Sequence, residues 1–157
     1  FGREVIRELN RLKICTDLSH LNDKSFFAAI EWADYPIASH SNSREICQVP
    51  RNLTDEQLRL IGAKNGLIGL CFYPKFLGGN IFEKIYENIC RLGELGLEDN
   101  IAIGSDFDGA DMPPELSDIS KVPDLYTYLE KRGISAETLK KIFYENAQNY
   151  FDKLSGI

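Results

Sequence analysis

The sequence predicts an α/β protein, built on a parallel sheet whose strands alternate with helices. Three observations lead to this class. Short apolar runs that suit strands alternate along the chain with segments whose apolar residues recur at helical spacing. One run, residues 66–77, is apolar on both faces, which is typical of a buried strand in a parallel sheet. Four strand–helix units follow one another, and this order favours a parallel sheet.

The first two predicted strands each follow a helix. Residues 3–12 carry apolar residues at helical spacing, and the short run "KICTDLSH" after them suits a strand. A second helical segment covers residues 23–33. Pro36 then opens the strand "PIASHS", which contains a histidine between two serines.

The third unit has the clearest helix start in the chain. In the helix predicted over residues 53–65, Thr54 is followed three residues later by Gln57, which is the signature of a capping box. The strand predicted over residues 66–77 comes next. A helix over residues 81–96 follows this strand and ends in glycine.

The fourth unit ends in an acidic loop. "NIAIGSDFDG", residues 100–109, predicts a strand that runs into a loop containing aspartate and glycine. A proline-rich stretch follows over residues 113–123. Two further helices are predicted after it, in "DLYTYLEKRG" and "SAETLKKIFYENAQNYFDKL".

The number of units predicts half of a (β/α)8 barrel. Four βα units are half of the eight in such a barrel, which typically needs about 250 residues, and the chain has 157. An open, doubly wound sheet is the alternative, and it would also gather functional residues at the carboxyl ends of its strands. Because no linker or low-complexity segment interrupts the alternation, residues 1–157 are expected to form a single domain.

Composition excludes several classes of function. The net charge of −6 argues against general binding to nucleic acid or to anionic membranes. No apolar run approaches the roughly 20 residues that span a bilayer, so no membrane-spanning segment is expected. The four cysteines are widely spaced and include no C-x-x-C pair, which favours reduced cysteines and a cytoplasmic location.

The two histidines of the chain, His20 and His40, both lie at the ends of predicted strands and both follow a serine. Imidazole nitrogen is a good ligand for zinc, and two rings from neighbouring strand ends could bind one ion. Such rings could be oriented by a neighbouring hydroxyl or carboxylate, from Ser19, Ser39, Ser41 or Asp17. The pattern alone leaves open that each histidine is only a hydrogen-bonded residue at a strand end.

Two further motifs contain side chains that could take part in hydrolysis. Asp106 and Asp108 in "GSDFDG" follow the fourth strand, where a carboxylate could bind metal, act as a base or hold a water, although Asp and Gly also suit a tight turn. Arg51 follows the His40 strand and could bind a substrate carboxylate, or could be a solvated arginine near a helix start. Together these residues predict metal-assisted hydrolysis of a small anionic substrate.

With this combination the sequence resembles the renal, or membrane, dipeptidase family of zinc peptidases. The matching runs occur in family order over almost the whole chain: "GREVIRELNRL", "DLSH", "ASHSNSREIC", "PRNLTDEQL", "IGSDFDG" and "SDISKVPDLYTYLEKRG". The resemblance implies a (β/α) barrel with a two-zinc site at the carboxyl ends of the strands, which hydrolyses dipeptides. It also implies that His20 and His40 bind one zinc, that Arg51 binds the dipeptide carboxylate, and that Asp106 accepts and donates the proton.

One departure from the family pattern limits this expectation. The family also needs an H-x-D pair, a glutamate that bridges the two zinc ions and a further histidine, and the chain has neither an H-x-D nor a third histidine. The chain is therefore expected to be the C-terminal half of such an enzyme, with at most one half-formed zinc site. Its expected partners are a dipeptide and either the missing N-terminal half or a second copy. The alternative function is a catalytically incomplete half barrel that associates with itself and hydrolyses nothing alone. A weaker alternative is a different barrel hydrolase that uses metal to cleave another small amide or ester.

Overall fold

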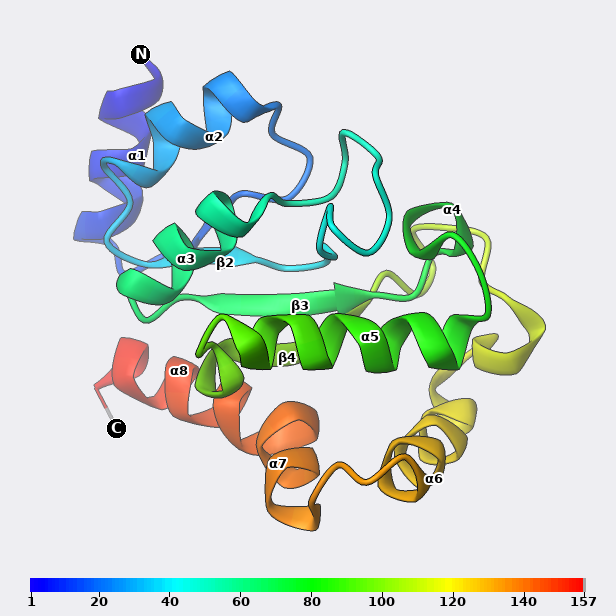
Figure 1. Ribbon diagram of the computed structural model, residues 1–157. Helices are drawn as coiled ribbons and strands as arrows, with labels where there is room; N and C mark the ends of the chain where they lie inside the picture. Colours follow the sequence, from blue (N-terminus) through cyan, green and yellow to red (C-terminus); the bar gives the residue numbers. More distant parts are fainter. Residues whose placement is uncertain (157) are drawn as a thin grey trace.

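A parallel sheet forms the centre of the fold, as predicted. The computed structural model describes residues 1–156. Its four strands pair in chain order, β1–β2–β3–β4, and every pairing is parallel. The strands are β1 (Thr16–Asp17), β2 (Pro36–Ala38), β3 (Leu67–Cys71) and β4 (Ile101–Ser105). Because the strands are parallel, their carboxyl ends lie at one edge of the sheet, and the segments that follow them share that edge (Figure 1).

Helices connect the strands and lie along the sheet. The α-helices are α1 (Gly2–Arg11), α2 (Asp23–Ile30), α3 (Asp55–Ala63), α4 (Pro74–Leu77), α5 (Ile81–Glu94), α6 (Val122–Lys131), α7 (Ala136–Lys140) and α8 (Asn146–Ser155). The shorter turns are η1 (Glu98–Asn100), η2 (Pro114–Leu116), η3 (Ile119–Lys121) and the π-helical η4 (Lys141–Glu145). Consecutive helices contact each other, α1 with α2, α2 with α3, α5 with α6 and α6 with α7 (Figure 1).

The hydrophobic core lies between β3 and the helices. All five residues of β3 are buried, as the two-sided apolar run predicted. Phe26 of α2, Phe72 directly after β3, and Ile85 and Leu92 of α5 are fully buried in the same cluster. Because β3 is tightly packed, it holds the neighbouring strands β2 and β4, and therefore their ends, in fixed positions.

The capping box of α3 forms as the sequence predicted. The Thr54 hydroxyl accepts a hydrogen bond from the backbone N–H of Gln57, and the Gln57 side chain accepts one from the N–H of Thr54. Both bonds satisfy N–H groups that the first turn of a helix leaves free. The start of α3 is thereby fixed directly after the loop that carries Arg51.

Several predicted elements differ in their extent. The strands predicted in "KICTDLSH" and "PIASHS" extend only over Thr16–Asp17 and Pro36–Ala38. The run 66–77 forms a strand only to Cys71, because Pro74 begins the short helix α4, where proline's fixed φ suits the first turn. The long final helix is interrupted by η4. There Ile142 is buried, and the Asn146 side chain donates hydrogen bonds to the carbonyls of Glu98 and Ile101. This attachment to the start of β4 competes with regular helical geometry.

Both outer strands of the sheet have a free edge within residues 1–156. β1 pairs only with β2, and β4 pairs only with β3, so the sheet does not close. Several large apolar side chains are also exposed, among them Phe1 (98%), Ile119 (72%) and Tyr144 (60%). Among the described residues, no helix combines the length and apolar character needed to cross a membrane.

Candidate active site

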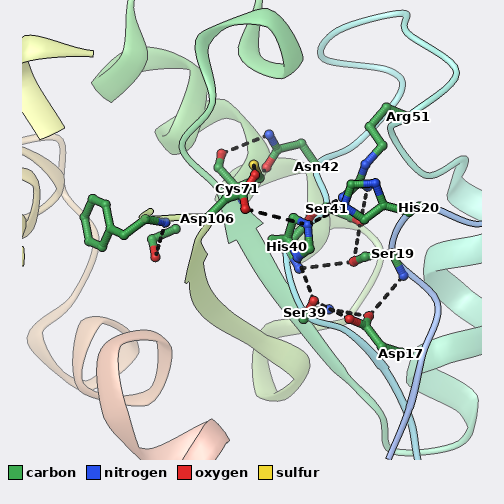
Figure 2. A network of polar contacts seen from close by, with 12 residues as sticks. Asp17, Ser19, His20, Ser39, His40, Ser41, Asn42, Arg51, Cys71 and Asp106 are labelled. Atoms are coloured by element: carbon green, nitrogen blue, oxygen red, sulfur yellow. Dashed lines mark hydrogen bonds and ion pairs between the residues drawn. The ribbon is translucent and has the colours of Figure 1, made fainter. Parts of the chain in front are cut away.

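The two histidines meet at the carboxyl ends of β1 and β2. The Nε2 atoms of His20 and His40 lie 2.8 Å apart, and the ring centroids are 4.9 Å apart. The two strands are adjacent and parallel, and His20 and His40 follow them by three and two residues, so the rings come to one place (Figure 2). At this distance the two nitrogens can share a hydrogen bond or face a common ion.

The His40 ring is tied to β1 through a serine. The Nδ1 atom of His40 lies 2.6 Å from the Ser39 hydroxyl, and this hydroxyl donates a hydrogen bond of 2.5 Å to Oδ2 of Asp17 (Figure 2). The other carboxylate oxygen, Oδ1, accepts the backbone N–H groups of Ser19 and Ser39, each at 3.0 Å. Asp17 therefore links the ends of β1 and β2 beneath the histidine pair.

A second network holds Arg51 beside His40. The Nη1 atom of Arg51 donates to the Ser41 hydroxyl and Nη2 donates to the His40 carbonyl, both at 2.9 Å. Ser41 lies 3.0 Å from the Ser19 hydroxyl, which also accepts the backbone N–H of His40 at 3.1 Å. The guanidinium stands 5.4 Å from the ring centroid of Phe76. Within residues 1–156 the Nε atom of Arg51 is buried and has no hydrogen-bond partner.

Asp106 reaches the histidines from the end of β4. Its Oδ1 atom lies 3.9 Å from Nε2 of His40, and its Oδ2 atom lies 4.0 Å from the buried thiol of Cys71. The side chains of His40 and Asp106 are 17% and 18% exposed, so both lie at a rim that a small molecule can reach. Figure 2 shows these residues together with the serines of the network.

Several residues at this rim have a positive φ, a backbone conformation that residues other than glycine rarely adopt. His20 has a φ of 69°, Asp106 of 74°, Asp108 of 63° and Ser105 of 33°. Each such residue costs of the order of 1 kcal/mol, and such costs gather at functional sites where the surrounding structure enforces them. The positions of His20 and Asp106 are thus set by tertiary structure rather than by local preference.

Two glycines make room for the end of β2. A Cβ atom added to Gly69 or to Gly104 would lie 2.1 Å from the carbonyl oxygen of Ser39. A glycine inside a strand often marks such a close approach of another backbone segment. The absence of side chains at these two positions lets Ser39 and His40 pass close to β3 and β4.

Burial sets the charge state of the site. Burial lowers the pKa of His40 below its ordinary value; the Asp106 carboxylate opposes this effect, and the charge of Arg51 adds to it. The neutral imidazole is the form that binds a metal ion. Burial also lowers the pKa of Arg51 and raises that of the Cys71 thiol to about 11, so this thiol stays protonated near neutral pH.

A cleft of about 440 Å³ lies at this rim. Two of the four predicted site residues, His20 and Asp106, line it together with Tyr73, Phe76 and Asp108, whereas His40 and Arg51 do not. A larger cleft of about 740 Å³ lies at the opposite end of the sheet, beside the starts of β3 and β4. None of the four predicted site residues lines that larger cleft, so size alone does not identify the site.

The structure brings all four predicted residues, His20, His40, Arg51 and Asp106, to one rim. Of the orienting partners suggested by the sequence, Ser39 contacts the His40 ring and Asp17 accepts from Ser39, whereas Ser19 accepts from the backbone of His40. The position of Phe76 beside Arg51 and the clearance provided by Gly69 and Gly104 were not predicted. The glycines could have been noticed, because they interrupt two otherwise apolar strands.

The donor set fits part of a zinc site. His20 and His40 present two ring nitrogens to one point, and imidazole is a common zinc ligand. Within residues 1–156, however, no group of three or more His, Cys, Asp or Glu side chains is arranged to hold a metal ion. Zinc sites in proteins usually have three or four protein ligands, so a full coordination shell needs donors beyond this pair.

Comparisons with known proteins agree on one family. Residues 1–155 match the family model described as membrane dipeptidase, peptidase family M19. An uncharacterized dipeptidase of Schizosaccharomyces pombe is 34% identical over 152 residues, which cover 92% of this chain and 37% of that protein. The chain spans between 36% and 56% of the length of three curated relatives that it matches.

Solved structures show the same fold over part of their length. The crystal structure of dipeptidase AC, a metallopeptidase of family M19, matches with a TM-score of 0.92 and 34% identity, over 99% of this chain and 48% of that one. A metallopeptidase from Rhodobacter sphaeroides, crystallised with a phosphinate mimic of the dipeptide L-Ala-D-Ala, matches with a TM-score of 0.91 and 34% identity, over 98% and 46%. These matches confirm the predicted α/β fold with four parallel strands of a TIM-type barrel. The chain therefore belongs to the membrane dipeptidase family, peptidase family M19.

Proposed function

We propose that the chain takes part in the metal-dependent hydrolysis of the peptide bond of dipeptides, as part of a binuclear zinc dipeptidase. The convergence of His20 and His40, with Nε2 atoms 2.8 Å apart, beside Asp106 and Arg51 is the observation that carries this proposal. The R. sphaeroides relative was crystallised with a dipeptide mimic, which supports a substrate of this class.

In this proposal His20 and His40 hold one zinc ion through Nε2. The low pKa of His40 keeps its ring neutral and able to bind metal near neutral pH. A bound zinc ion supplies Lewis acidity, which polarises a carbonyl group and makes water more acidic. The positive φ of His20 accompanies the close approach of its ring to that of His40.

Asp106 and Arg51 then act on the substrate and on water. Asp106 lies 3.9 Å from Nε2 of His40, close enough to accept a proton from a water at the rim and return it to the leaving amine. Arg51 binds the substrate carboxylate. A guanidinium has five N–H donors, and within residues 1–156 two hydrogen bonds engage this one, to Ser41 and to the His40 carbonyl. Its partial burial strengthens a charge-assisted contact.

A second candidate function follows from the incomplete donor set. Residues 1–156 do not place three metal-binding side chains together, and the sheet edges at β1 and β4 are free. We therefore propose that the chain alone does not hydrolyse substrate, and that it acts with an N-terminal half barrel or a second copy that supplies further ligands. Exposed apolar side chains such as Leu12, Ile14 and Phe151 are suited to such an association.

Two expectations about the chain as a whole remain proposals. We propose that residues 1–157 act as a single domain, supported by one continuous core from Leu18 to Ile142. We also propose a cytoplasmic location, supported by Cys15, Cys47, Cys71 and Cys90, none of which forms a disulfide.

Dipeptide hydrolysis measured with and without an added N-terminal half barrel, in the presence of zinc, tests this function. We expect turnover only in the combined sample, and its loss when His40 is replaced by alanine. Matched metal removal with a chelator should abolish the same turnover. The proposal is contradicted if the combined sample hydrolyses no dipeptide, or if His40→Ala leaves turnover unchanged. Turnover by the chain alone would contradict the second candidate.

A further inference from the structure

Ser39 stands between a carboxylate and the His40 ring, and this arrangement fixes the positions of hydrogens. Its hydroxyl oxygen lies 2.5 Å from Oδ2 of Asp17 and 2.6 Å from Nδ1 of His40. An ionised carboxylate can only accept hydrogen bonds, so the hydroxyl must donate its single hydrogen to Asp17. Toward His40 the hydroxyl oxygen can then only accept, and Nδ1 of His40 must carry a hydrogen.

This arrangement determines the other nitrogen of His40. A neutral imidazole carries one hydrogen, so with Nδ1 protonated the Nε2 atom of His40 presents a lone pair. That lone pair faces Nε2 of His20 at 2.8 Å. When the two nitrogens share a hydrogen bond, the hydrogen therefore belongs to Nε2 of His20. The two histidines then have opposite tautomers.

We propose that Asp17 and Ser39 act as a positioning pair, which holds His40 as its Nδ1–H tautomer and directs its Nε2 lone pair to a divalent metal ion. The metal part of this proposal rests on the function proposed above. Asp17 also accepts the backbone N–H of Ser39 at 3.0 Å, so the carboxylate holds both the serine backbone and its hydroxyl. A ligand oriented in this way binds metal more tightly, and loss of such a partner typically costs 10- to 100-fold in affinity.

A purely structural role for the pair predicts something different. If the bonds served only to join β1 to β2, removing the hydroxyl would affect stability but not the His40 tautomer. Ser39→Ala removes the hydroxyl and keeps the backbone bond from Ser39 N–H to Asp17. Asp17→Asn places an amide that can donate to Ser39, so the serine hydroxyl becomes free to donate to Nδ1 of His40. This second variant should therefore invert the tautomer.

The test is nitrogen NMR of the histidine rings in the metal-free chain, at about pH 8, where histidine is neutral. We expect His40 to be Nδ1–H and His20 to be Nε2–H. Ser39→Ala should give a mixture of His40 tautomers, and Asp17→Asn should favour Nε2–H. Zinc affinity, measured by competition with a chelator, should fall about 10- to 100-fold in both variants. Ser43→Ala is the matched control, because Ser43 is a buried serine whose hydroxyl, among the described residues, accepts a hydrogen bond only from the N–H of Glu45.

The outcomes separate this proposal from the proposed function. A wild-type His40 in the Nε2–H form overturns the positioning pair, and this measurement needs no variant to fold. An unchanged tautomer or an unchanged zinc affinity in Ser39→Ala overturns it as well. If the tautomers are as expected but wild-type chain and the combined half barrels bind no zinc, the hydrogen positions stand and the metal function fails.

Discussion

At the residue scale, Arg51 is held in place by contacts on several sides. It is partly buried, stands beside Phe76, and makes hydrogen bonds to Ser41 and to the carbonyl of His40. These contacts fix the guanidinium but leave some of its N–H groups free. A side chain held in this way loses little conformational freedom when it binds a carboxylate.

Replacing Arg51 should therefore weaken substrate binding more than the chemical step. A charge-assisted hydrogen bond contributes about 1.5–3 kcal/mol, so Arg51→Ala should raise KM about 10- to 100-fold with a smaller change in kcat. Steady-state kinetics of the chain combined with an N-terminal half measures both constants. Arg59→Ala is a suitable control, because Arg59 is exposed and lines the cleft at the opposite end of the sheet. Unchanged KM in Arg51→Ala would remove the carboxylate-binding role.

The residues of the site could be predicted from sequence where a strand end marks them. His20, His40 and Asp106 each follow a short apolar run, and parallel strands bring such ends together. The contacts of Phe76 with Arg51 and of Cys71 with Asp106 could not be predicted. Each joins residues 25 or more positions apart, and no periodicity of the chain records such a pairing.

At the scale of elements, the end of β2 depends on two glycines in neighbouring strands. Gly69 and Gly104 lie in β3 and β4, and a Cβ at either position would approach the Ser39 carbonyl to 2.1 Å. Ser39 belongs to the segment that carries His40, so the packing of two central strands controls a site residue on a third. This explains why glycine occurs in strands that are otherwise apolar.

A methyl group at position 69 should therefore disturb both stability and zinc binding. Overpacking of this kind typically costs about 1–3 kcal/mol, and relief of the clash must move Ser39 and with it His40. Chemical denaturation and zinc titration of Gly69→Ala measure the two effects. Gly93→Ala in α5 is the matched control, because its added Cβ meets nothing closer than 3.7 Å. Equal zinc affinity in both variants would contradict the link between the glycine and His40.

Element boundaries were harder to predict than element types. The four strands and the capping box of α3 are where the apolar pattern indicates. The predicted strand 66–77 was too long, because Pro74 starts a helical turn within an apolar run. The break at η4 has no marker in the local sequence, since it depends on the attachment of Asn146 to distant carbonyls.

At the scale of the whole molecule, the four strands described within residues 1–156 form an open sheet and do not close into a barrel. Its outer strands β1 and β4 each have one neighbour within residues 1–156, and its solved relatives are about twice as long as this chain. Free strand edges and exposed apolar side chains favour association with other chains.

We expect the isolated chain to associate in solution. Light scattering should give a mass well above the 17.8 kDa of one chain, and an added N-terminal half barrel should compete with self-association. Binding of an apolar dye should fall when the two halves combine, because the exposed faces become covered. A stable 17.8 kDa species that binds no dye would contradict this expectation.

Anomalous X-ray scattering at the zinc edge can show whether His20 and His40 hold a zinc ion between them. In crystals of the chain combined with an N-terminal half and grown with zinc, we expect an anomalous peak about 2 Å from Nε2 of each histidine. His40→Ala crystals should lose or weaken this peak. Zinc bound elsewhere, or no peak between the two rings, would contradict the proposal that His20 and His40 hold a zinc ion.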